Sequence, residues 1–429
     1  MIQSIIAKLK IDKSFIKNSF IVFAGCLVVS ILNYLFRAIS GRTLGPTEYG
    51  TLGFLLSILT FFAIFSSSIN NLVAKFTSEA VAKSKPKEIR YIFDTLYKYS
   101  LYIGIGVFAI LLIFSRVIGQ SFKVNPIYIQ SMGIVFIFIF TNTVGKAVLQ
   151  GEKKFNQLMI VNISESVSKI LLFLVFVYFG YRIGAGVGAF IGSVIITACL
   201  VYFIVNKRLI KQKTRVELRS LKKYFSMTFI SLGLFSVFAF IDIPLAKYFL
   251  NEYDAGLYAG LSDISKILFY IVTPILLVMF PIISEKFTKK QKHYQILAQT
   301  ILIAICLIVP ALLVYYFFPE TIVSILYGNK FLPISNYLFL GGLAMSILVF
   351  CNMFIQYFLS IKKTNFYKYI ILAIITLFIM FYFYHQNIGQ IMINLIASFS
   401  LLLIMFVGYY LHYKKRQITK IFLNYINLD

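Results

Sequence analysis

Apolar stretches of about twenty residues recur along this chain from one end to the other, separated by short segments that carry most of the charge. A helix of about 20 apolar residues is long enough to cross a bilayer. Of the 429 residues, 60% are hydrophobic and 13% are charged, against roughly 45–50% and 25% in soluble domains. This composition excludes a soluble enzyme, a disordered protein and a disulfide-stapled secreted domain. It predicts an all-α integral membrane protein.

The hydropathy pattern divides the chain into twelve predicted transmembrane helices. The first apolar run, about residues 19–36, is longer than the 7–15-residue core of a signal peptide, so it is interpreted as a retained helix. The runs lack the alternation of a transmembrane barrel. The predicted spans are residues 18–38, 50–74, 93–116, 126–149, 157–179, 184–206, 225–246, 255–282, 294–318, 334–360, 366–384 and 389–412.

The distribution of Lys and Arg predicts the orientation. The net charge is +26, and 32 of the 41 Lys and Arg fall in segments that lie inside if the N-terminus is inside. Seven fall outside, and Lys169 and Lys266 lie within spans. Cytoplasmic loops of membrane proteins are rich in Lys and Arg. The bias predicts both termini in the cytoplasm, and it explains the charge without nucleic acid as a partner.

The two halves of the chain resemble each other. The run Leu44–Gly50 after the first span is echoed by Leu250–Gly256 after the seventh. Asn142, Lys146 and Gln150 before Lys153-Lys154 are echoed by Asn352, Gln356 and Ser360 before Lys362-Lys363. Parallel repeats of this kind occur in transporters that move two halves around a central site. We expect a six-helix lobe at 1–206, a basic cytoplasmic linker at 207–224 and a second six-helix lobe at 225–429.

Polar side chains inside the spans are the candidate functional residues, because ionisable groups in a membrane usually face a cavity or a partner. The first span carries Asn33 and Arg37 on one face, and the fifth carries Glu165 and Lys169. Structural explanations stay open. Glu165–Lys169 and Asp263–Lys266 are spaced so that each pair can neutralise itself within one helix. Arg37 can snorkel to the interface, and Asp242 can lie at the membrane boundary.

Motifs of soluble chemistry are missing from the sequence. It contains no P-loop and no HExxH or CxxC motif, so no cofactor, metal or built-in ATPase is expected. The four cysteines lie in apolar stretches and are interpreted as small hydrophobic residues. They are Cys26, Cys199, Cys306 and Cys351.

Three short motifs resemble those of the polysaccharide-export flippases of the MOP superfamily, which also contains the MATE drug exporters. They are the run Arg42–Gly50, the run Leu149–Phe155 after the fourth span, and Gly256-Leu257-Tyr258 opening the eighth span. Pro274 and Phe280-Pro281 in the same span complete the set. The resemblance covers nearly the whole chain, although the motifs are short.

The resemblance implies two six-helix lobes that work by alternating access in the bacterial cytoplasmic membrane. The implied substrate is an undecaprenyl-diphosphate-linked oligosaccharide for O-antigen, capsule or teichuronic-type polysaccharide, with a polysaccharide polymerase and chain-length machinery as possible partners. The implied substrate-binding cavity would contain Asn33, Arg37, Asn142, Lys146, Lys169, Lys266, Asn352 and Gln356. The candidates for coupling to H⁺ or Na⁺ are Glu165, Asp242 and Asp263.

Other classes of membrane protein stay open. A MATE-type exporter of cations would favour carboxylates without basic neighbours, and only Asp242 lacks one within a turn. A membrane glycan polymerase, ligase or glycosyltransferase usually needs a large outer loop or a cluster of catalytic acids, and neither is evident in the sequence. A scaffold protein is a further alternative. The sequence does not identify the glycan, the coupling ion or the oligomeric state.

Overall fold

The computed structural model describes residues 13–426 except 211, 213, 215–232 and 290, and this part of the chain is helical without strands. Ten of its helices are long and apolar enough to cross a membrane, and the apolar helix Tyr367–Phe383 is shorter. The prediction of a multi-pass, all-α membrane protein is therefore confirmed. The helices are α2 (Lys13–Leu44), α3 (Pro46–Ala82), α4 (Pro86–Phe122), α5 (Pro126–Gly151), α6 (Phe155–Tyr178), α7 (Ile183–Arg208), α9 (Asp242–Phe249), α10 (Glu252–Thr288), α11 (Tyr294–Phe317), α12 (Pro319–Tyr327), η2 (Asn329–Ile334), α13 (Ser335–Ser360), α14 (Tyr367–Phe383) and α15 (Ile388–Ile426).

Proline and asparagine mark where helices begin. Pro46, Pro86 and Pro126 are the first residues of α3, α4 and α5. This position suits proline, because the first backbone N–H groups of a helix have no partner within the helix. The Asn125 side chain also caps α5 by accepting a hydrogen bond from the N–H of Ile127 at 3.0 Å. Local sequence thus fixes these helix starts.

Helices α5 and α13 end in the same turn. Lys153 after α5 and Lys362 after α13 both have a left-handed backbone, with φ of 58° and 57°. The residue after each of these lysines donates its backbone N–H to a carbonyl five residues earlier. Lys154 donates to Leu149, and Lys363 donates to Phe358. This is the Schellman arrangement of helix ends. The two Lys-Lys pairs that the sequence aligned therefore occupy matching turns.

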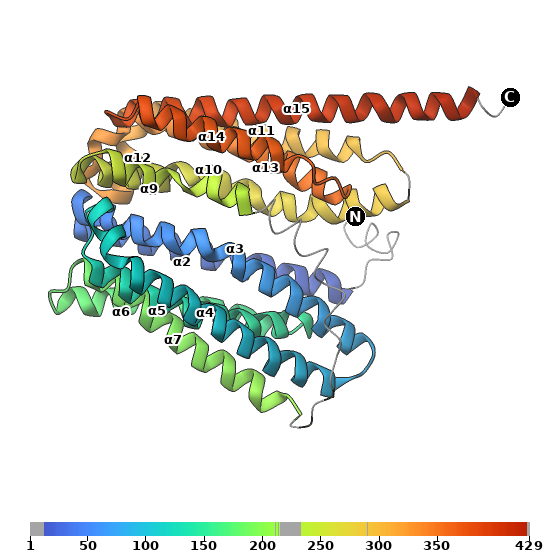
Figure 1. The fold of residues 1–429 in the computed structure, drawn as a ribbon, viewed down its shortest axis with the longest axis horizontal. Helices are drawn as coiled ribbons and strands as arrows, with labels where there is room; N and C mark the ends of the chain where they lie inside the picture. Colours follow the sequence, from blue (N-terminus) through green and yellow to red (C-terminus); the bar gives the residue numbers. More distant parts are fainter. Residues whose placement is uncertain (1–12, 211, 213, 215–232, 290, 427–429) are drawn as a thin grey trace. The chain divides into compact units, whose positions relative to one another are not determined.

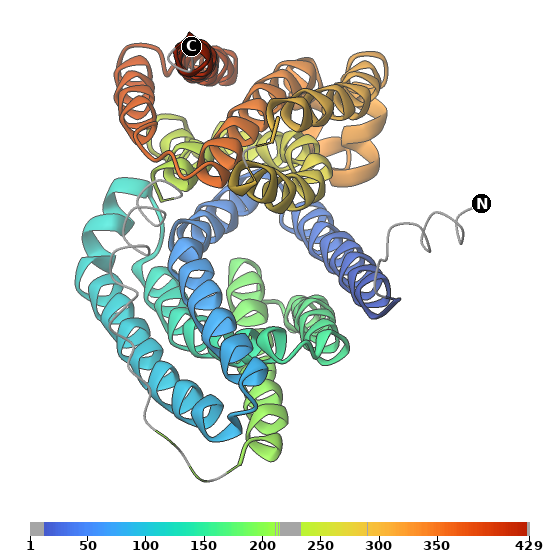
Figure 2. The ribbon, with the colours of Figure 1, turned by 90° about the vertical axis from the view of Figure 1, so that its right-hand side faces the viewer.

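The chain divides into two compact units, each with its own packing. Unit 1 comprises Met1–Leu44 and Ile58–Leu221, and unit 2 comprises Gly45–Ser57 and Lys222–Asp429. In unit 1, α5 packs against α4 and α7, and α6 packs against α7 and α2. In unit 2, α13 packs against α10, α11 and α15, and α14 covers α15. Figure 2 shows many of these helices nearly end-on.

The first turns of α3 pack with unit 2, although the sequence placed them in the N-terminal lobe. Two glycines allow this contact. A Cβ atom on Gly50 would lie 2.7 Å from the Cα atom of Gly256 on α10, so α3 and α10 approach backbone to backbone. Small residues permit such close crossings in membranes. Helix α3 therefore contributes to both units.

The seventh predicted span differs most from its prediction. Residues 225–232 lie outside the described part of the chain, as does the linker from residue 215. Residues 233–240 form a helix that is interrupted at Ile241, and α9 follows. Lys247 was expected in an outer loop, but it lies in α9 with 2% of its surface exposed. The connection before α13, which was predicted to lie outside, contains the helices α12 and η2.

Candidate functional site

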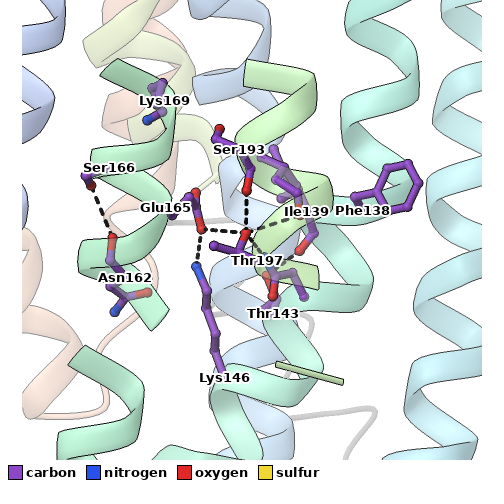
Figure 3. A network of polar contacts seen from close by, with 12 residues as sticks. Phe138, Ile139, Thr143, Lys146, Asn162, Glu165, Ser166, Lys169, Ser193 and Thr197 are labelled. Atoms are coloured by element: carbon purple, nitrogen blue, oxygen red, sulfur yellow. Dashed lines mark hydrogen bonds and ion pairs between the residues drawn. The ribbon is translucent and has the colours of Figure 1, made fainter. Parts of the chain in front are cut away.

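Three helices of unit 1 bring together a lysine, a glutamate and a threonine. The Lys146 ammonium on α5 lies 2.5 Å from Oε2 of Glu165 on α6. The Thr197 hydroxyl on α7 lies 3.5 Å from the same oxygen. Figure 3 shows both groups meeting at this carboxylate. The Lys146 and Glu165 side chains are 20% and 23% exposed, so the ion pair lies at the edge of the packed interior.

Asn142 extends this group of residues into the interior of unit 1. Its amide Nδ2 donates to the Thr197 hydroxyl at 3.0 Å. Its Oδ1 is buried and has no hydrogen-bond partner in the structure. Buried acceptors are normally satisfied. Asn142 therefore retains an unused acceptor one turn before Lys146 on the same helix.

Lys169 does not use Glu165 as its hydrogen-bond partner, although the two are one turn apart on α6. Its ammonium donates to Oδ1 of Asn33 on α2 at 2.9 Å. It also lies 4.4 Å from the ring centroid of Phe190 on α7, within cation–π range. Figure 3 shows Lys169 one turn along α6 from Glu165, with no contact drawn between them. Glu165 forms its direct ion pair with Lys146 on the neighbouring helix, and Lys169 interacts with Glu165 through its charge without a direct contact.

This unit 1 cluster carries more positive than negative charge. Lys146 and Lys169 face one carboxylate, Glu165, and Arg37 on α2 is close enough to Lys169 to repel it. Arg37 and Asn33 are half-buried, and Lys169 is 7% exposed. With Lys146, Lys169 and Glu165 ionised, these three groups carry one more positive than negative charge. Such a site can hold an anion through charge-assisted hydrogen bonds.

Unit 2 has a second polar cluster, centred on Asp242 at the start of α9. Lys266 on α10 lies 3.0 Å from Oδ1 of Asp242. Oδ2 accepts hydrogen bonds from Ser262 at 2.5 Å and from Tyr258 at 3.1 Å. Asp242 is fully buried and Lys266 is 5% exposed. Asp242 has no basic residue within one turn of its own helix, but Lys266 on α10 supplies its positive partner. That Asp242 lies at the membrane boundary stays a prediction.

Asp263 is held by tyrosine rather than by Lys266. The Tyr49 hydroxyl at the start of α3 donates to Oδ2 of Asp263 at 2.5 Å and also contacts the Tyr327 hydroxyl at 2.9 Å. The proposed internal pair Asp263–Lys266 is therefore corrected. Neither tyrosine was predicted as a polar partner from the sequence, although Tyr49 lies in the run Arg42–Gly50 that resembles the flippase motif. A second contact, from Lys247 to Thr51 at 3.4 Å, joins α9 to α3 in the same unit.

The two remaining candidates, Asn352 and Gln356, make no described contact with the residues of either cluster. Asn352 and Gln356 are on α13, where Asn352 is buried and Gln356 is half-buried. Neither makes a described hydrogen bond to Asp242, Asp263 or Lys266. The structure thus brings together Asn142, Lys146 and Glu165 in unit 1, as well as Asn33 with Lys169. Among the described residues, no three His, Cys, Asp or Glu side chains converge as a metal site would require.

Comparison with known proteins identifies one matching sequence family and several solved structures with a similar fold. The sequence model of a family described as polysaccharide biosynthesis protein matches residues 15–287. Among solved structures, an inward-facing multidrug resistance MATE family transporter of the MOP superfamily is similar with a TM-score of 0.75. It is 15% identical and the match covers 90% of this chain and 95% of that one.

A MOP superfamily transporter from Pyrococcus furiosus, described as having a binding pocket of reverse polarity, is also similar. Its TM-score is 0.62 at 15% identity, over 92% of this chain and 94% of that one. At such identities the likeness shows the fold. No curated protein matches the chain in sequence.

Proposed function

The chain belongs to the polysaccharide biosynthesis protein family, and on this premise we propose that it is a flippase for a lipid-linked oligosaccharide. The substrate is an undecaprenyl-diphosphate-linked oligosaccharide for a surface polysaccharide, and it moves from the inner to the outer leaflet by alternating access. The diphosphate and the sugars cannot cross hydrocarbon alone, because burying unpaired charge is very costly.

The observation that carries this proposal is the cationic excess of the unit 1 cluster. Lys146 and Lys169 lie on adjacent helices, and Glu165 is the carboxylate that pairs with Lys146. A diphosphate would compete with Glu165 for Lys146 and would offer Lys169 an acceptor in addition to Asn33. Arg37 would add a guanidinium, which suits phosphate geometry. The buried carboxylates of unit 2 already have donors, so they offer little to a cation.

Transport in proteoliposomes tests the proposal. The protein would be reconstituted with a fluorescent undecaprenyl-diphosphate-linked sugar, and translocation would be measured by protection from a membrane-impermeant quencher. We expect Lys146→Gln and Lys169→Gln to lower the rate by about tenfold or more, since each removes a charged hydrogen bond. Lys85→Gln is the matched control, because Lys85 pairs with Glu88 at 2.7 Å on an exposed helix start. Wild-type protein that leaves the labelled lipid in place would contradict the function.

The structural likeness to MATE transporters keeps a cation exporter as the second candidate. The same vesicles, loaded with a cationic dye under a proton or sodium gradient, distinguish the two. Dye transport without lipid transport would favour the exporter. A dependence of lipid transport on either gradient would identify the coupling ion, and we propose Glu165 as the coupling carboxylate because it is the most accessible of the three candidates.

The proposed location is the bacterial cytoplasmic membrane with both termini inside. Its basis is the excess of Lys and Arg in alternate connecting segments. Reporter fusions after residues 45, 215, 325 and 420 should indicate outside, inside, outside and inside. A fusion at 215 that indicates outside would contradict this orientation. The polysaccharide polymerase and the chain-length machinery are the proposed partners, and cross-linking in cells would test them.

A further inference from the structure

The turn that ends α13 presents a lysine to a tyrosine on α15. The left-handed Lys362 and the hydrogen bond from the N–H of Lys363 to Phe358 at 2.9 Å fix the backbone of this turn. The Lys363 ammonium lies 5.7 Å from the ring centroid of Tyr413. Both lysines of the turn are exposed. The turn therefore holds positive charge beside an aromatic ring at one end of unit 2.

A second lysine–tyrosine pair adjoins the first. Lys414, which follows Tyr413 in α15, lies with its ammonium 5.2 Å from the ring centroid of Tyr294, the first residue of α11. Three separate elements, namely the turn after α13, α15 and the start of α11, thus contribute to one surface. We call Lys363, Tyr413, Lys414 and Tyr294 the lysine–tyrosine surface.

Buried aromatic side chains support this surface from within. The Tyr357 hydroxyl on α13 lies 3.0 Å from Nδ1 of His293, the residue before α11. The ring of Tyr410 on α15 packs 5.5 Å from that of Tyr357. These contacts connect α11, α13 and α15 beneath the lysines. The spacing of the surface residues is therefore set by packed side chains.

The matching turn of unit 1 contains an acidic residue, whereas this one does not. After α5, Glu152 precedes the Lys-Lys pair and forms an ion pair with Arg208 at 3.4 Å. The corresponding residue after α13 is Ile361. In the described part of unit 2, Lys363 and Lys414 contact tyrosine rings and form no ion pair. The lysine–tyrosine surface therefore has positive charge available for an anion from outside the chain.

We propose that the lysine–tyrosine surface binds the headgroup of an anionic phospholipid. Tyrosine is enriched where membrane meets water, and its hydroxyl can reach the headgroup. Lysines beside the membrane attract the headgroups of anionic lipids. A phosphodiester bound at this surface would offset one of the two positive charges of Lys363 and Lys414. The leaflet is the inner one if the proposed orientation holds, but binding does not depend on the transported substrate.

The absence of tryptophan from the sequence allows a direct test. The variant Tyr413→Trp places the protein's single tryptophan in the surface, where it can be excited selectively over tyrosine. It would be reconstituted in phosphatidylcholine vesicles that contain a small fraction of a brominated lipid, with the bromine high on the acyl chain. The brominated lipid is phosphatidylglycerol in one sample and phosphatidylcholine in the other, and the quenching of tryptophan fluorescence is compared. We expect brominated phosphatidylglycerol to be preferred by about twenty-fivefold, since each of the two lysines near the headgroup contributes on the order of fivefold. Adding Lys363→Gln and Lys414→Gln should reduce the preference to below about twofold.

Two matched controls separate this site from general attraction to the membrane. Lys98 lies 5.9 Å from the Tyr102 ring on α4 as an isolated pair, so a Tyr102→Trp reporter should show little preference. In the Tyr413→Trp protein, Lys154→Gln, at the matching turn, should leave the preference unchanged. Equal quenching by both lipids, or a preference that survives loss of both lysines, would overturn the proposal.

Relief of quenching by soluble pyrophosphate would also overturn it, since the surface would then bind a diphosphate rather than a phospholipid. If a reporter variant does not fold, native mass spectrometry of the wild-type protein and of the Lys363→Gln/Lys414→Gln variant provides the same comparison. More phosphatidylglycerol should be retained by the wild type. Equal retention would contradict the proposal. None of these readouts involves transport, so their failure leaves the proposed function intact.

Discussion

The two polar clusters contain the same kinds of residues but differ in burial and in charge balance. In unit 1, the Lys146–Glu165 pair is about one-fifth exposed, and Lys169 and Arg37 add positive charge. In unit 2, the Asp242 and Lys266 side chains are 1% and 6% exposed and neutralise each other. A buried, balanced pair mainly fixes structure, whereas an accessible cluster with excess charge can still bind. This difference is the reason why we propose that the ligand binds in unit 1, whereas the Asp242–Lys266 pair of unit 2 stabilises the fold.

The largest expected effect comes from breaking the balanced pair. Asp242→Leu leaves the Lys266 ammonium buried without its carboxylate, which should destabilise the protein by about 3–5 kcal/mol. Adding Lys266→Met should restore most of the loss, because replacing a whole buried pair is often neutral. Thermal unfolding in detergent, followed by size-exclusion chromatography, measures both. A double variant no more stable than the single one would show that the pair has a further role.

The hydrogen bond between Tyr49 and Asp263 should have the next largest effect. Tyr49→Phe removes a donor to a buried carboxylate, and such bonds contribute about 1.5–3 kcal/mol. The same unfolding assay measures the loss. Tyr253→Phe is the control, because Tyr253 is 47% exposed in the same region and should change stability by less than about 0.5 kcal/mol. Equal losses in the two variants would mean that the buried bond adds nothing.

In unit 1 the expected loss is in binding. Lys146→Gln should weaken binding of undecaprenyl diphosphate to the purified protein by about tenfold to thirtyfold, in line with one charged hydrogen bond. Glu165→Gln should bind at least as tightly as the wild type, since it removes the carboxylate that competes for Lys146. Microscale thermophoresis with a labelled protein measures both. Weaker binding by Glu165→Gln would contradict an anion site here.

The smallest expected effect is on the stability of unit 1. Glu165→Gln should destabilise the protein by less than about 1 kcal/mol, because accessible ion pairs contribute little. The double variant Glu165→Gln with Lys169→Met should still bind diphosphate less well than the wild type, since Lys169 is bonded to Asn33 and not to Glu165. Normal binding and transport by the double variant would remove Lys169 from the site. Chemical denaturation and the binding assay test these two expectations.

Side-chain pairing shows where prediction from sequence reached its limit. The sequence placed Glu165 and Lys169 one turn apart, and Asp263 and Lys266 three residues apart. In the structure, the direct ion-pair partners of Glu165 and Lys266 lie on other helices, and so does the tyrosine that donates to Asp263. Spacing along a helix reports which side chains share a face, but it does not report which neighbouring helix presents a closer partner. The pairs Lys146–Glu165 and Asp242–Lys266 each join two helices. Neither pair could be assigned without knowing that α5 packs on α6 and that α9 packs on α10.

The sequence by itself determined the class of fold, and it contains the signals at which several helices begin, because both depend on local properties. Apolar length fixes what can span a bilayer, and proline or a capping asparagine fixes where several helices begin. The matching Lys-Lys turns after α5 and α13 were also readable, since a repeat preserves spacing. Tertiary structure alone decided that Tyr49 holds Asp263, that Lys247 is buried, and that the first turns of α3 pack with unit 2. These features depend on contacts between residues about 200 positions apart, which no local pattern encodes.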